Sequence, residues 1–271
     1  MSKRNISKLF YRDYFQENRN PQVDYKFDFI LSSNGKPSEA MIKEIARRNK
    51  AIKEVELKSI PKVPIVRKED CFTLKILYPG LVTGIGLVHD SKKLEGGYNL
   101  GMHFDYTWGM PVVYGSSVKG VLREYFQEFY EGGMDAIDLE EEIFSGKIRN
   151  KKKDTTDKNG KLIRGYDNKS IYHRDIFFDA VITKPYKSNN KEHLLEDDSI
   201  TPHGDNPLKN PLPITMLKIA PGCEIEFRFR LVDSVIDENI FSKKNKLELF
   251  MKILKTVGVG AKTNVGYGQL E

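Results

Sequence analysis

The chain has few cysteines: only Cys71 and Cys223, each inside an apolar stretch. It contains no CxxC motif, no Cys/His cluster and no pair of carboxylates at metal-ligand spacing. We therefore expect no structural zinc and no disulfide framework. No metal or other cofactor is expected either. Such cysteine usage is typical of a cytoplasmic protein.

Long apolar runs are also lacking, since none approaches the ~18 residues that a membrane-spanning helix needs. The first 17 residues are charged and aromatic, unlike the apolar core of a signal peptide. We therefore expect no membrane partner. The 271 residues are 39% hydrophobic with 15 Phe, enough for a core, and the formal charge of +6 gives a basic bias that is compatible with nucleic acid without establishing it.

The pattern of apolar residues predicts an α+β fold. Strands are expected at residues 71–78, 176–183, 213–219 and 224–232, with a last strand at the chain end. Helices are expected from Ser116 to Gly132 and over residues 244–257. We interpret this order as a ferredoxin-like βαββαβ core, the topology of the RNA recognition motif, with long insertions.

Two segments are predicted to lie outside that core. Residues 1–69 form an N-terminal extension whose one helix, near residues 37–57, has a narrow apolar stripe, and the domain proper covers residues 70–271. Residues 147–174 carry ten basic and three acidic side chains with little apolar content. We expect this basic insertion to be a mobile loop.

The C-terminal stretch is rich in glycine: Gly258, Gly260, Gly266 and Gly268 surround Lys262. Glycine permits positive φ and close backbone approach, and bare amides beside a lysine can cradle a phosphate. A simple turn into the last strand is the alternative. The stretch is not a P-loop, because Ala261 stands where that motif needs glycine, so no nucleotide or other small-molecule substrate is predicted.

A second stretch combines a helix start with basic residues. Ser116 or Ser117 is expected to be the N-cap, and Lys119 and Arg123 share the helix face away from the core. The free amides and partial positive charge of a helix start suit a phosphodiester. A capped amphipathic helix with solvated basic residues explains the same pattern.

Support for catalysis is weak. His89, in a glycine-bearing loop, and His203, after Pro202, are the candidates for a general acid or base in a metal-independent ribonuclease. Asp179 lies in a strand-like run and is interpreted as either a cap for a neighbouring loop or a ligand. No nucleophile, base and orienting group occur in a recognisable order.

These stretches together resemble a known family. The C-terminal GVGAKTNVGYGQL is similar to the glycine-rich loop of the RAMP superfamily of CRISPR proteins, and GMPVVYGSSVKGVLREYF resembles its PxxPGSSxKGxxR signature, with Tyr114 in place of the proline. The segments TGIGLVHD, IFFDAVITKP and TPHGDNPLKNPLPITMLKIAPG resemble the family of the sixth subunit of the type III-B Cmr complex, with Gly204 where an aromatic is common.

The resemblance covers about residues 70–271 and implies a non-catalytic backbone subunit. Such a subunit would bind CRISPR guide RNA toward its 3′ end, support target-RNA recognition in antiviral defence, and contact the other Cmr subunits. The matching positions make the following residues candidates for RNA binding: His89, Ser116, Ser117, Lys119, Arg123, Gly258, Gly260, Lys262, Thr263, Asn264 and Gly266. The alternative is a RAMP-type endoribonuclease that processes the guide precursor.

Overall fold

The computed structural model describes residues 5–15, 39–57, 70–84, 96–201 and 213–271. The helices are α1 (Ile6–Tyr11), α2 (Glu39–Lys53), α3 (Gly115–Phe129), α4 (Ala136–Glu140) and α5 (Lys243–Val257), with short 3-10 or π turns at Asp13–Phe15, Glu141–Ser145, Lys151–Lys153, Ile171–His173 and Thr263–Val265. The strands are β1 (Cys71–Lys75), β2 (Val112–Val113), β3 (Lys147–Arg149), β4 (Thr155–Thr156), β5 (Leu162–Ile163), β6 (Tyr166–Asn168), β7 (Ile176–Phe177), β8 (Ala180–Lys184), β9 (Tyr186–Ser188), β10 (Lys191–His193), β11 (Leu195–Ile200), β12 (Ile214–Ile219), β13 (Glu224–Arg230), β14 (Ser234–Ile236) and β15 (Asn239–Phe241).

A central antiparallel sheet joins distant parts of the chain. Its strands follow the order β1, β13, β8, β2, and β7 also pairs with β13. The chain end lies beside β1, because the Lys75 amide donates to the Glu271 carbonyl at 2.9 Å and the Leu77 amide to the Gln269 carbonyl at 2.9 Å. The mixture of helix and antiparallel sheet that the sequence predicts is confirmed.

Strand β13 forms the centre of the core, as its alternating sequence predicts. Ile225, Phe227 and Phe229 are fully buried, and Phe72 of β1 stacks on Phe227 with ring centroids 5.5 Å apart. Alternate residues of a strand point to the same side of the sheet, so these three side chains give one continuous apolar face.

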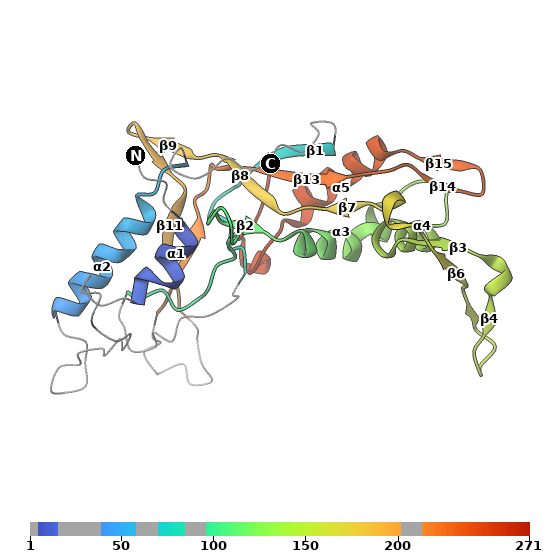
Figure 1. The fold of residues 1–271 in the computed structure, drawn as a ribbon, viewed down its shortest axis with the longest axis horizontal. Helices are drawn as coiled ribbons and strands as arrows, with labels where there is room; N and C mark the ends of the chain where they lie inside the picture. The colour runs from blue at the N-terminus through green and yellow to red at the C-terminus, as the bar shows by residue number, and fades with distance from the viewer. Residues whose placement is uncertain (1–4, 16–38, 58–69, 85–95, 202–212) are drawn as a thin grey trace.

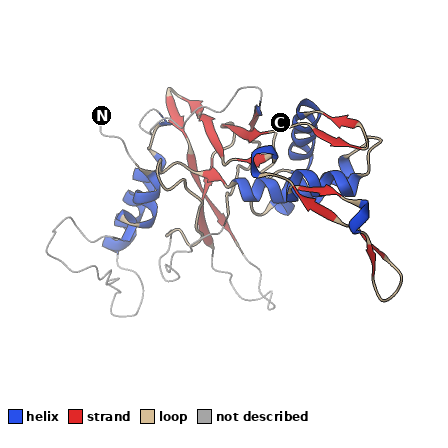
Figure 2. Ribbon diagram, turned by 45° about the vertical axis from the view of Figure 1, so that its right-hand side comes forward, coloured by secondary structure: helices blue, strands red, loops and turns tan. Residues whose placement is uncertain are grey.

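Helices α3 and α5 pack against each other and against this sheet (Figures 1 and 2). Besides Gly115 at its start, the buried residues of α3 are Val118, Leu122 and Phe126, which recur every fourth position and lie on the predicted helix face. On α5, Phe250 packs against Phe229 with ring centroids 5.5 Å apart.

The inward face of α5 contains a lysine besides its apolar residues. Lys246 is fully buried, and its Nζ donates to Asp175 at 2.6 Å and to the Val232 carbonyl at 2.7 Å. Burial raises the pKa of Asp175 and lowers that of Lys246. The partner lies 71 residues earlier in the chain, so helical periodicity could not identify this buried pair.

The described part of the N-terminal extension, residues 1–69, packs against the rest of the domain. Ile6, Phe10 and Tyr14 are buried in the main cluster, and Phe10 stacks on Tyr98 with centroids 5.7 Å apart. The three residues stand four apart and therefore form one helical face, a pattern that the charged surroundings obscured. On α2, which ends at Lys53 rather than at residue 57, Ile52 is buried as well.

The basic insertion at residues 147–174 is likewise more regular than the loop that the sequence predicts. Strand β3 pairs with β6 and β4 with β5, giving a long hairpin that projects from one end of the molecule (Figure 1). Ion pairs hold its base: Arg149 contacts Asp138 and Asp154, and Lys169 contacts Glu142 at 2.6 Å. These acidic partners lie mostly before the insertion, so tertiary contacts neutralise the basic residues at its base.

Candidate nucleic-acid interface

The glycine-rich stretch forms a closed loop after α5. The amide of Val259 donates to the carbonyl of Gly268 at 3.0 Å, which joins the two ends of the loop. The Ala261 amide donates to the Val82 carbonyl and the Gly268 amide to the Gly80 carbonyl, each at 2.8 Å. The loop is therefore fixed to residues 80–82 by its backbone.

All four glycines adopt the conformation that the sequence predicts. Gly258, Gly260, Gly266 and Gly268 have φ values of 76°, 97°, 95° and 73°. A Cβ on Gly268 would overlap the Val259 carbonyl, and one on Gly260 would overlap the Val82 carbonyl. Positive φ and close backbone approach are thus both required here, and the prediction is confirmed.

The loop presents one lysine to its surroundings. Lys262 has a left-handed φ of 64° and precedes the 3-10 turn at Thr263–Val265, in which Asn264 is exposed. Among the described residues, the Lys262 ammonium has no acidic partner. A half-exposed lysine on a glycine-rich loop is chemically suited to an anion such as a phosphodiester.

The far side of the loop is anchored to β11 and β12. The Tyr267 hydroxyl donates to Asp198 at 2.8 Å, and Lys218 contacts the same carboxylate at 2.7 Å. Burial, with the adjacent Asp198, raises the pKa of Tyr267 to about 12. The tyrosine therefore stays a neutral donor, and the anchor keeps the loop in place at ordinary pH.

The start of α3 differs from the prediction. Neither Ser116 nor Ser117 is the N-cap; that position is Tyr114, whose side chain makes no capping bond. The Gly115 amide instead donates to the Asp179 carboxylate at 2.7 Å. Asp179 lies between β7 and β8, and its carboxylate caps the start of α3. Of the two roles considered for it, the structure shows a cap.

This cap changes what the helix start can bind. An internal carboxylate already occupies the first amide of α3, where the helix dipole favours negative charge. Ser116 is exposed and Ser117 is half-buried. A phosphate at this position would therefore contact the serine hydroxyl groups and Lys119 rather than the first backbone amide of the helix.

The two basic residues of α3 have different surroundings. Arg123 donates to Glu140 at 2.9 Å and to Glu141 at 2.7 Å, both near α4. Lys119 lies over the Phe177 ring, 5.9 Å from its centroid, and pairs with no acidic side chain in the described residues. Arg123 is thus largely neutralised, whereas Lys119 keeps its charge available.

Residues 80–84 connect the loop to the helix start. Val82 pairs with Ala261, and the Thr83 hydroxyl accepts from the His103 amide at 3.0 Å. The His103 ring stacks on Tyr114, immediately before α3, with centroids 4.3 Å apart. Burial lowers the pKa of His103, so the imidazole is neutral near pH 7.

Sequence reasoning gave no role to His103 and Tyr114. A histidine and a tyrosine eleven residues apart carry no periodic signal. Backbone pairing of residues 103–105 with residues 110–112 brings them together. The other predicted histidines, His89 and His203, lie outside the described residues.

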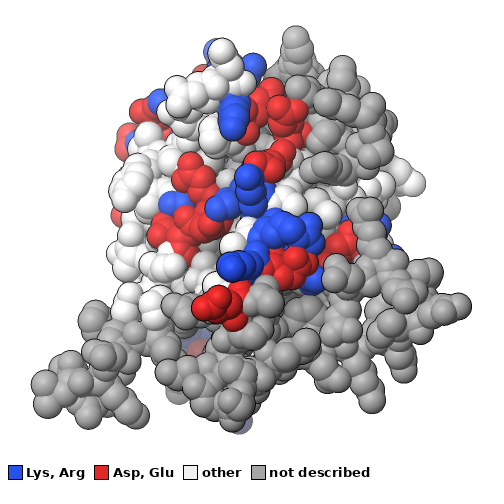
Figure 3. Space-filling view, turned by 90° about the vertical axis from the view of Figure 1, so that its left-hand side faces the viewer, with Lys and Arg blue, Asp and Glu red and all other residues white. Residues whose placement is uncertain are grey.

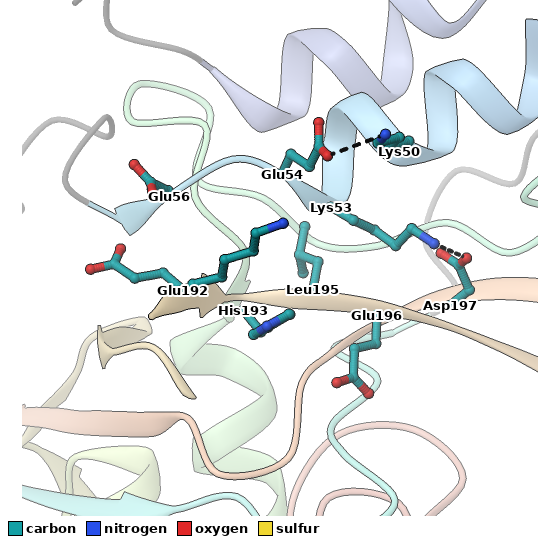
Figure 4. A pocket seen from close by; sticks show the side chains of 10 residues that line it. Lys50, Lys53, Glu54, Glu56, Glu192, His193, Leu195, Glu196 and Asp197 are labelled. Atoms are coloured by element: carbon teal, nitrogen blue, oxygen red, sulfur yellow. Dashed lines mark hydrogen bonds and ion pairs between the residues drawn. The ribbon is translucent and has the colours of Figure 1, made fainter. Parts of the chain in front are cut away.

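A separate hollow of about 620 Å³ lies between α2 and the strands β10 and β11 (Figure 4). Two of its three lysines are in ion pairs, Lys53 with Asp197 and Lys50 with Glu54 at 3.7 Å, and glutamates line it as well. The surrounding face carries basic and acidic side chains next to each other (Figure 3). This hollow therefore offers no uniform charge for a phosphate chain.

Two further properties concern the described residues alone. None of their His, Cys, Asp and Glu side chains form a group of three or more that could hold a metal ion. Among their helices, none is both long and apolar enough to span a bilayer.

Comparison with known proteins gives a family. No curated protein matches the chain. Among solved structures, it is similar to a chain of the type III-B Cmr-beta complex bound to cognate target RNA (22% identity, 74% of this chain, 57% of that one, TM-score 0.45). It is also similar to Cmr6 from Pyrococcus furiosus (18%, 74% and 96%, TM-score 0.31) and to a chain of a type IV-B CRISPR complex (13%, 74% and 88%, TM-score 0.38).

The chain thus spans 57% of the length of the first of these proteins. The family model of the RAMP superfamily matches residues 73–271. This range includes the glycine loop, the start of α3 and the central sheet apart from the first two residues of β1. The protein belongs to the RAMP superfamily.

Proposed function

We propose that this protein is a non-catalytic, RNA-binding backbone subunit of a type III-B CRISPR (Cmr) effector complex. The observation that carries the proposal is the fixed glycine loop with Lys262, which has no acidic partner among the described residues. The loop is bound to residues 80–82 through its backbone. Thr83 of the adjoining segment accepts from His103, whose ring stacks on Tyr114 directly before α3. Superfamily membership is consistent with this role. By resemblance to the sixth-subunit family, the chain caps the complex near the 3′ end of the guide RNA.

The core is inferred to be ferredoxin-like. The chain end, β1, β13 and β8 lie side by side in that order, and all of these neighbours are antiparallel. Helix α3 comes between β1 and β8 in the chain, and α5 comes between β13 and the chain end. The chain thus contains two strand–helix–strand units, β1–α3–β8 and β13–α5–chain end. In the sheet, β13 lies between the two strands of the first unit and β1 lies between the two strands of the second, as in a βαββαβ fold.

The RNA backbone is proposed to run from the glycine loop to the start of α3. Lys262 and Lys119 supply the charge, while Ser116, Thr263 and Asn264 supply hydrogen-bonding groups. Arg123 is expected to add less, because Glu140 and Glu141 already neutralise it. The mixed-charge face around α2 is proposed to contact other subunits of the complex (Figure 3).

Salt-dependent RNA binding tests this proposal. Binding of a fluorescein-labelled single-stranded RNA is measured between 50 and 300 mM salt for the wild type and for Lys119→Ala/Lys262→Ala. Each lost phosphate contact should flatten the slope of log affinity against log salt by roughly 0.7. Lys244→Ala removes an exposed lysine of α5 and serves as the matched control. Wild-type slope and affinity in the double variant would contradict the proposed interface.

Cleavage assays address the ribonuclease alternative. Purified protein incubated with CRISPR repeat RNA in EDTA should give no specific products. His89→Ala and His203→Ala should leave guide-directed cutting by the assembled complex intact. A several-hundred-fold loss of rate with normal assembly would instead identify a nuclease.

A further inference from the structure

The stacked pair of His103 and Tyr114 lies outside both hydrophobic clusters of the described core. The two rings are nearly parallel, at 19°, with centroids 4.3 Å apart. Tyr114 is 37% exposed, and its hydroxyl donates to the Phe104 carbonyl at 3.5 Å. The tyrosine ring is thus held by His103 on one side, while part of the residue stays open to solvent.

The backbone holds both rings rigidly. The His103 amide donates to Thr83, and the His103 carbonyl accepts from Val112 at 3.1 Å. Tyr114 directly follows β2, which pairs with β8. The backbone of Gly84 lies against the His103 ring, so that a Cβ at this position would overlap the imidazole. The Tyr114 ring is therefore pre-organised, which lowers the entropic cost of binding a flat group.

The surroundings of the ring match a single-stranded nucleic acid. Exposed Ser116 and charged Lys119 lie within the first turns of the helix that follows Tyr114. On the other side, residues 82–84 lead to the glycine loop with Lys262. Proteins that bind single-stranded RNA combine an exposed aromatic ring for a base with adjacent cations for the backbone.

Resting on the proposed function, we propose that Tyr114, backed by His103, is a stacking platform for one nucleobase of the bound single-stranded RNA. The base would extend the His103–Tyr114 stack as a third layer, while its phosphates reach Lys119 and Lys262. Every base has an aromatic face, so the platform takes any of the four and adds affinity without sequence selectivity.

Ring variants and abasic RNA test the platform on the full-length protein. Tyr114→Leu keeps an apolar side chain and removes the ring, and it should weaken binding of a single-stranded 12-mer roughly 5- to 100-fold at fixed salt. Tyr114→Trp should bind as the wild type does. The slope of affinity against salt should stay unchanged for both variants, since no phosphate contact is lost. Tyr186→Leu is the matched control, because Tyr186 is 43% exposed and also lies beside a histidine, His193.

A matched RNA with internal abasic sites keeps the test independent of any folding defect in the variant. Wild-type protein should lose affinity for it, and Tyr114→Leu should then cost little more, because base and ring act as one pair. If Lys119→Ala/Lys262→Ala weakens binding but Tyr114→Leu does not, the platform is overturned and the RNA interface stands. If wild-type protein does not bind the 12-mer, both proposals fail. Unchanged RNA binding with ring-dependent loss of complex assembly would assign the ring to a protein partner and overturn the platform.

Discussion

The N-terminal helices and the 147–174 insertion are attached to the molecule by different interactions. Ile6, Phe10 and Tyr14 insert apolar and aromatic surface into the main core. The insertion instead uses ion pairs at its base, such as Arg149 with Asp138, while its tip leaves Leu162 and Ile163 half exposed. Burial of apolar area acts on the stability of the whole domain, whereas ion pairs at the base of a projecting hairpin hold that hairpin alone.

The largest effect on stability is expected for Phe10→Ala. The ring is fully buried and contacts Tyr98, Tyr11 and Phe104, so its loss should lower the free energy of unfolding by about 3–5 kcal/mol. Urea denaturation followed by circular dichroism measures this change. Tyr106→Ala, at an almost fully exposed ring, should change stability by less than about 0.5 kcal/mol. Similar small losses for both variants would mean that the N-terminal helices are not part of the core.

A smaller and local effect is expected for Asp138→Asn. This buried carboxylate accepts from Arg164 at 2.7 Å and from Tyr166 at 2.8 Å, and it also pairs with Arg149. Its neutralisation should cost about 1–3 kcal/mol, seen as faster hydrogen exchange over residues 147–168 with little change elsewhere. Asp237→Asn, at an exposed pair with Lys151, is the control. Uniformly faster exchange throughout the domain would show that the insertion and the core unfold as one unit.

The insertion and the N-terminal helices should lose stability at opposite extremes of pH. Arg149 lowers the pKa of Asp154 from 3.8 to about 2, and Arg164 lowers that of Asp135. Carboxylates with a depressed pKa stabilise the folded form above their unfolded pKa and lose this effect as pH falls from about 4 toward 2. Acid should therefore loosen the hairpin first.

The N-terminal helices should respond in the opposite direction. Burial raises the pKa of Tyr14 from 10.0 to about 12, so its stabilising effect is complete below pH 10 and is lost as pH rises toward 12. Amide and side-chain NMR signals from the two segments, followed across pH, report both transitions. A hairpin that stays ordered at pH 2, or N-terminal helices that loosen in acid before the hairpin does, would contradict this assignment.

The smallest effect on stability is expected when the hairpin tip is removed. Replacement of residues 155–163 by a short glycine turn deletes mostly exposed side chains, so the melting temperature should change by only about 2 °C. RNA or complex binding should nevertheless weaken, because we expect the basic insertion to order against guide or target RNA. Hydrogen exchange in the tip should be fast in the free protein and slower in the complex. Strong protection of the tip in the free protein would contradict that expectation.

Sequence reasoning was most accurate where a local pattern determines the structure. The alternation in β13, the apolar face of α3 and the positive φ of Gly258, Gly260, Gly266 and Gly268 depend on neighbouring residues and on the absence of a side chain. It was wrong about the N-cap of α3, because the capping carboxylate, Asp179, lies 64 residues away. Arg123 was likewise considered available, since its partners Glu140 and Glu141 come from a later helix and turn.

By itself, the sequence determined the class of fold, the main helices and strands, the glycine loop and, through its motifs, the superfamily. Each of these follows from the periodicity of apolar residues, from residue type or from a short contiguous motif. Only the tertiary structure decided which charges have partners: within the described part of the chain Lys262 and Lys119 have no acidic partner, whereas Arg123 and Arg149, at the base of the insertion, form ion pairs. It also decided that Phe10 is core and that Tyr114 stacks on His103. Ion pairs and ring contacts of this kind form between residues far apart in the chain, and no local pattern specifies which partner a side chain will meet.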